Sequence, residues 1–178
     1  MSDEIALEVG QAASRDEVDD LVTAWRRERP DLDVSPLEVL SRVTRLARHL
    51  DRARGQAFSR HGLEGWEFDV LAALRRSGEP YRVSPGRLLQ QTLVTSGTMT
   101  NRIDRLAARG LVERHPSLDD RRSVMVQLTD AGAAKVDAAL IDLLDHERAI
   151  LAELSDLDAE SLAGLLRQVL TRFDRPEL

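Results

Sequence analysis

The 178-residue chain contains no cysteine and few aromatic residues. The absence of cysteine excludes disulfides, thiol redox sensing and cysteine-based metal sites. Aromatic residues make up 3% of the chain while 42% of it is hydrophobic, a balance that favours helices packed through aliphatic side chains. No signal peptide and no apolar run of about 18 residues can be recognised. The sequence therefore predicts a cytoplasmic protein with no membrane partner.

Patterns that are typical of catalysis and of metal binding are also absent. The four histidines lack the spacing of metal ligands. The chain contains neither a Gly-x-Ser-x-Gly nucleophile motif nor a glycine-rich loop that would cradle a phosphate. We therefore expect a protein that is not an enzyme and that has no metal site and no cofactor.

Positive charge is concentrated in one window of an acidic chain. The net charge is −6, but residues 75–122 carry ten arginines against five acids, which gives this window +5 and leaves −11 elsewhere. Attraction to phosphate is local, because salt screens it within about 8 Å at physiological ionic strength. A basic region on an acidic body is typical of a surface that binds double-stranded DNA.

Residues 84–110 have the pattern of a helix-turn-helix, with a first helix over 84–92 and a second that ends at Gly110. Thr95 or Ser96 can serve as the N-cap of the second helix. The predicted buried stripe of this helix is formed by Met99, Ile103 and Leu106. Its opposite face carries short polar side chains and arginines that suit phosphates and base edges: Ser96, Thr98, Thr100, Asn101, Arg102 and Arg105. Such a face alone is usually only solvated, and it is the wing that follows which favours DNA contact.

Two short strands over 112–116 and 123–128 are predicted to form this wing, around a charged tip that contains Arg121 and Arg122. Two aspartates precede these arginines. An arginine held by an aspartate suits a narrow, electronegative minor groove, although a surface ion pair of little energetic value is the alternative. One buried face is expected in the second strand, formed by the alternating residues Val124, Val126 and Leu128.

The wing resembles that of the MarR family of regulators. It carries Asp-x-Arg at 120–122 and, five residues later, Leu-Thr-x-x-Gly at 128–132, and the preceding SGTMTNRIDRLAARGLVER is similar to the recognition helix of that family. The resemblance covers about residues 36–173. It implies a mainly α-helical fold with a small β-wing, a winged helix-turn-helix in each subunit of an obligate dimer, and release from DNA on binding a small molecule.

Helical periodicity continues on both sides of this segment. Further helices are expected over 16–29, 36–60, 64–76, 130–153 and 158–173. The apolar stripes of the last two are too broad for a helix that lies on one small domain, so a second copy of the chain is expected to cover them. The predicted organisation is an N-terminal extension with an extra helix over 1–35, dimerisation helices over 36–63 and 130–178, and a DNA-binding domain over 64–129.

The extra N-terminal helix resembles that of the PecS-type, urate-responsive branch of the family. Members of this branch carry a tryptophan in that helix, an aspartate before the DNA motif, and one arginine each in the recognition helix and the first wing strand. The matching positions are Trp25, Asp69, Arg102 and Arg114. The branch also includes readers of organic acids such as trans-aconitate and citrate, and these four positions do not separate urate from tricarboxylates.

The same residues suit a small anionic ligand on chemical grounds. Guanidinium groups bind carboxylates and anionic purines through their planar forks. Asp69 can pair with the arginines while the site is empty, and Trp25 can stack on a flat ligand. The structural alternatives are helix packing for Trp25, an ion pair between Asp69 and Arg102, and a phosphate contact for Arg114.

Three classes of function remain open at this stage. The first, which the sequence favours, is a homodimeric repressor that a small anionic metabolite releases from a palindromic operator. The second is a winged-helix DNA-binding dimer without small-molecule input. The third is a helical dimerisation module whose basic patch binds a protein.

Overall fold

The computed structural model describes residues 15–92, 95–116 and 124–173. The chain divides into two compact units, and the boundary between them in the sequence lies between His49 and Leu50. This division follows packing, and the functional boundaries predicted above remain predictions. Among the described residues, no helix combines the length and the apolar character needed to cross a membrane.

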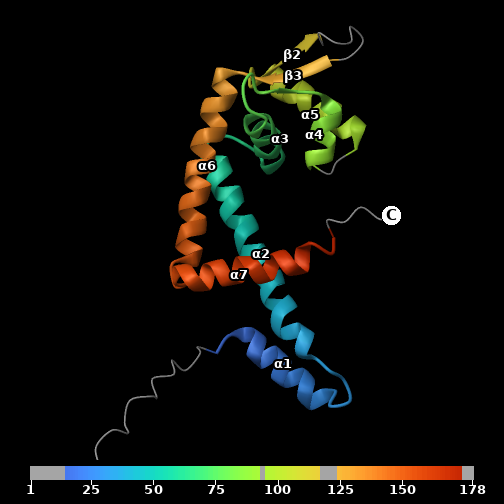
Figure 1. Cartoon of the computed structure of the whole chain (residues 1–178), viewed down its shortest axis with the longest axis vertical. Coiled ribbons are helices and arrows are strands. Elements are labelled where there is room, and N and C mark those ends of the chain that lie inside the picture. The colour runs from blue at the N-terminus through green and yellow to red at the C-terminus, as the bar shows by residue number, and fades with distance from the viewer. Residues whose placement is uncertain (1–14, 93–94, 117–123, 174–178) are drawn as a thin grey trace, which may run out of the picture. The chain divides into compact units, whose positions relative to one another are not determined.

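The helices and the two wing strands follow the order predicted from the sequence, and a third short strand precedes the helix-turn-helix (Figure 1). The helices are α1 (Glu17–Glu28), α2 (Ser35–Arg60), α3 (Gly65–Arg76), α4 (Pro85–Thr92), α5 (Ser96–Ala108), α6 (Asp130–Leu151) and α7 (Asp156–Leu170). The strands are β1 (Arg82–Val83), β2 (Val112–Pro116) and β3 (Val124–Leu128).

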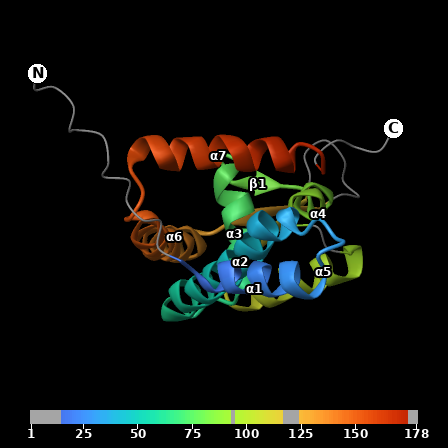
Figure 2. The same ribbon diagram turned by 90° about the horizontal axis from the view of Figure 1, so that it is seen from below.

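The first unit contains α1 and the start of α2 (Figure 2). Asp16 caps α1 by accepting a hydrogen bond from the Val18 amide at 2.8 Å, and the Arg42 guanidinium on α2 binds its carboxylate. This pairing with Arg42 holds the pKa of Asp16 below its usual range. Leu21 and Trp25 of α1 are 40% and 48% exposed, so this unit alone buries only part of the apolar side of the helix. A small buried cluster holds α1 and α2 together: Val18, Val22 and Val34.

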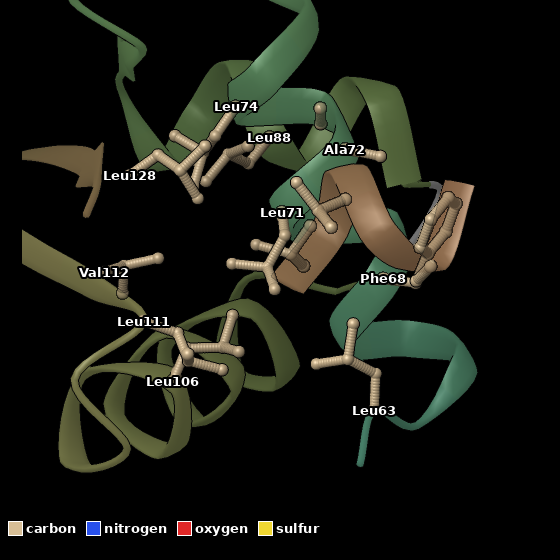
Figure 3. Close-up of a cluster of buried hydrophobic side chains, with 14 of the residues drawn as sticks. Leu63, Phe68, Leu71, Ala72, Leu74, Leu88, Leu106, Leu111, Val112 and Leu128 are labelled. Atoms are coloured by element: carbon tan, nitrogen blue, oxygen red, sulfur yellow. The ribbon is translucent and has the colours of Figure 1, made fainter. Parts of the chain in front are cut away.

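The second unit has one continuous core beneath a three-stranded antiparallel sheet. The strand order is β1-β3-β2. The rings of Phe58 and Phe68 stack with centroids 4.0 Å apart and so join α2 to α3. Figure 3 shows how helices and strands meet in this core. Its side chains include Leu71, Leu74, Leu88, Leu106, Val112 and Leu128.

α5 packs as predicted, but one residue of β3 does not. Val124 was expected on the buried face of β3 and is instead 42% exposed. It pairs with Pro116 at the outer end of the hairpin, and the buried face begins at Val126. The predicted stripe of α5 is buried, and it comprises Met99, Ile103 and Leu106.

α6 begins beside the sheet, packs against the core through Val136, Ala139 and Leu143, and runs away from the sheet toward α7 (Figure 1). α7 begins two residues before the predicted start, because Ser155 caps it by accepting a hydrogen bond from the Asp158 amide. None of the residues of α7, all of which the structure describes, is buried. The apolar side of this helix is therefore only partly covered within its own unit.

Candidate DNA-binding site

The first turns of α5 present an exposed polar surface. Thr95 is the N-cap, with a backbone φ of −76° and a side chain that accepts from the Thr98 amide. The buried Met99 fixes which side of the helix faces the core, so the opposite side faces solvent. A helix N-terminus offers free amide donors and a positive dipole to a phosphate or a base edge. The residues predicted to contact DNA from this part of the helix are all exposed: Ser96, Thr98, Thr100 and Asn101.

The two arginines further along α5 lie on the first turn of α3. The guanidinium carbons of Arg102 and Arg105 are 5.3 Å and 4.7 Å from the centre of the Trp66 ring. Arg105 also donates to Glu64 Oε1 at 2.7 Å. The indole Nε1 of Trp66 donates to the other carboxylate oxygen at 2.7 Å. The Trp66 hydrogen bond, and after it that of Arg105, lowers the pKa of Glu64.

A buried charge holds the C-terminal end of α5. Glu67 is 1% exposed, and the Arg109 guanidinium donates to both of its oxygens at 2.5 Å. The same guanidinium donates to the Gly62 carbonyl at 2.7 Å. A buried charge is tolerated only when it is paired in this way. Arg109 therefore ties the end of α5 to α3 and to the turn that follows α2.

The Leu-Thr-x-x-Gly motif holds the same end of α5 from the other side. Thr129 caps α6 through the Gly132 amide at 3.0 Å, and its hydroxyl donates to the Gly110 carbonyl at 2.8 Å. Gly110 has a φ of +67°, the left-handed conformation expected where α5 ends. A Cβ on Gly132 would lie 2.2 Å from the Leu111 carbonyl oxygen. This motif is thus a structural device that positions α5.

The predicted ligand residues of the second unit make separate contacts. Asp69 forms an ion pair with Arg54 of α2, at 3.3 Å, and not with Arg102. Arg102 lies on Trp66, and Arg114 pairs with Asp104 of α5 at 2.8 Å. Trp25 belongs to the other unit.

Three of the contacting residues could not be identified from the sequence. Arg54, Glu64 and Trp66 are brought to their partners by packing between helices, and no local pattern marks them. Arg121 and Arg122, predicted at the wing tip, lie outside the described residues.

Comparison with known proteins identifies the fold and the class of function. Residues 61–123 match the sequence model of the MarR family. The chain is 42% identical over 153 residues to the HTH-type transcriptional regulator PecS of Dickeya dadantii, an alignment that covers 86% of this chain and 92% of PecS. The chain belongs to the MarR family of transcriptional regulators. The relatives of this family are DNA-binding regulators and not enzymes.

Solved structures agree with this assignment. A mutant of MarR from E. coli in complex with operator DNA is similar with a TM-score of 0.64 and 27% identity, over 78% of this chain and 99% of that one. BpsR of Bordetella bronchiseptica, whose DNA binding is regulated by 6-hydroxynicotinic acid, is similar with a TM-score of 0.58 and 26% identity, over 75% and 94%. The winged helix-turn-helix of this chain, with α5 as its recognition helix, is therefore a DNA-binding module.

Proposed function

We propose that this regulator is a homodimeric repressor that binds a palindromic operator and is released from it by a small anionic metabolite. DNA binding is supported by the exposed polar face at the start of α5, which lies inside the basic window of an acidic chain. The unburied α7 supports the dimer. The proposed DNA contacts are Ser96, Thr98, Thr100, Asn101 and Arg105 from α5, with Arg121 and Arg122 from the wing tip.

The operator should have two half-sites whose centres are about one helical turn, ~10 bp, apart. Residues 96–101 would enter the major groove, and Arg122 the flanking minor groove. Replacing Arg122 with alanine should weaken operator binding and lower the slope of log K against log salt by about 0.9 for each phosphate that the protein no longer neutralises. Arg27→Ala is the matched control, because Arg27 is an exposed arginine outside the basic window. Fluorescence anisotropy across a salt series measures both quantities, and parental affinity and slope for Arg122→Ala would disprove the wing contact.

The proposed ligand is a tricarboxylate such as trans-aconitate or citrate, with urate as the other candidate. The resemblance to the PecS-type branch supports an anion held by Trp25, Asp69, Arg102 and Arg114. A resemblance of the wider sequence to TamR, which responds to trans-aconitate and citrate, favours the organic acid, and two arginines offer more positive charge than one urate monoanion requires. BpsR, a protein similar to this chain, is regulated in its DNA binding by 6-hydroxynicotinic acid, which is a carboxylic acid.

Titration of each of the three anions into a fixed protein–operator complex tests this proposal. A ligand that prefers the DNA-incompetent state should lower operator affinity on the order of 5–150-fold. Trp25→Phe should change the affinity for the ligand and leave that for DNA alone, and Asp69→Asn should shift the release curve. Asp51→Asn, which neutralises an exposed acid on α2, serves as the control for the removal of one charge. If none of the three anions releases DNA at millimolar concentration, the protein is a DNA-binding dimer that these small anions do not regulate.

A further inference from the structure

The first turn of α3 forms a small plate beneath the middle of the recognition helix. We name it the Glu64–Trp66 plate after its two members. Arg102 and Arg105, three residues apart on α5, both lie over the Trp66 ring. The Glu64 carboxylate divides its two oxygens between the Trp66 indole and Arg105, at 2.7 Å each. The plate therefore orients one carboxylate toward an arginine of the DNA-reading helix.

The ion pair between Glu64 and Arg105 is open to exchange. The side chains are 58% and 51% exposed, in contrast to the buried Glu67 that holds Arg109. An exposed pair of this kind contributes little to stability and is screened by salt. A guanidinium fork suits a phosphate as well as it suits a carboxylate, so the phosphate of a docked DNA strand can take the place of Glu64.

We infer that Glu64 is an internal competitor of the DNA backbone for Arg105. In the free protein the carboxylate occupies the guanidinium, and on the operator a backbone phosphate displaces it. The Trp66 ring supports the arginine from below in both states. Glu64 thereby lowers operator affinity and sets part of its salt dependence. This inference rests on Arg105 as a DNA contact, as proposed above.

Glu64→Gln tests the competition, because the amide oxygen can still accept from Trp66 while the negative charge is removed. The structure predicts that operator affinity rises about two- to fivefold per subunit at low salt, which corresponds to the upper range measured for exposed ion pairs. Damage to the fold would lower affinity instead. Glu113→Gln is the matched control: Glu113 is an equally exposed acid on β2, it pairs with His115, and it reports the general effect of one negative charge less near DNA.

A double-mutant cycle with Arg105→Gln completes the experiment. Arg105→Gln alone should weaken operator binding, and in that background Glu64→Gln should gain no more than Glu113→Gln does. Parental affinity for Arg105→Gln would show that Arg105 contacts no phosphate and would overturn both the contact and the competition. A weakened Arg105→Gln combined with equal gains for Glu64→Gln and Glu113→Gln in the parent would overturn the competition and leave the DNA contact standing.

Discussion

Replacing Gly132 with alanine is expected to lower the free energy of unfolding by about 1–3 kcal/mol, the usual cost of overpacking a core. The new Cβ would lie 2.2 Å from the Leu111 carbonyl oxygen and 2.8 Å from Leu128 Cδ1. The first of these atoms belongs to the backbone, so no side-chain rotation can relieve the clash. The start of α6 and the end of α5 must move apart, which breaks the hydrogen bond from Thr129 to the Gly110 carbonyl. Operator affinity should therefore fall together with stability.

Urea unfolding of parent and variant at the same protein concentration measures this loss of stability, since the unfolding of a dimer depends on concentration. Gly86→Ala is the control. Gly86 lies in α4, and an added Cβ there meets nothing within 4 Å, so alanine should be neutral or stabilise by about 0.5–1 kcal/mol. A Gly132→Ala variant as stable as Gly86→Ala would show that the packing between α6 and the end of α5 is loose.

The fold was largely predictable because each helix carries its own periodic pattern, and because α5, α6 and α7 begin at hydroxyl residues that cap them. The stripe of Met99, Ile103 and Leu106 is visible in the sequence and is buried in the structure. The prediction is wrong where the burial of a residue depends on its neighbours in space and not on its position in the alternating pattern. Val124 continues the alternation of its strand, yet it lies opposite Pro116 at the outer end of the hairpin and is exposed, whereas Val126 is buried.

The contacts around α5 were harder to predict, because they join segments far apart in the chain. Arg105 meets Glu64, and Asp69 meets Arg54, only after the helices have packed. The sequence does contain one indication of an ion pair that involves a buried charge. Glu67 has the helical spacing of the buried residues Leu71 and Leu74, and a carboxylate on an apolar stripe requires a cationic partner. The sequence does not identify Arg109 as that partner.

Placing a charge on α7 is expected to prevent assembly. Leu165 is 62% exposed within its own chain, and it lies on the stripe that a second copy is proposed to cover. An obligate homodimer interface buries about 2,000 Å² or more, and burial of one leucine contributes about 1.5–3 kcal/mol. A glutamate at this position would remove that contribution in both subunits and would bury a charge without a partner. Leu165→Glu should therefore yield monomer or unfolded chain under conditions in which the parent is a dimer.

Sedimentation equilibrium from nanomolar to micromolar concentration measures this effect. Gln168→Glu is the control, since it adds the same charge to an exposed position off the apolar stripe of the same helix, and it should remain dimeric. Leu165→Ala removes the apolar contact without adding a charge, so it separates loss of the interface from charge-induced unfolding. It should lower the midpoint of unfolding and make that midpoint more dependent on protein concentration. If Leu165→Glu and Leu165→Ala both sediment as the parental dimer, α7 lies outside the interface, and the dimer must be built from α2 and α6 alone.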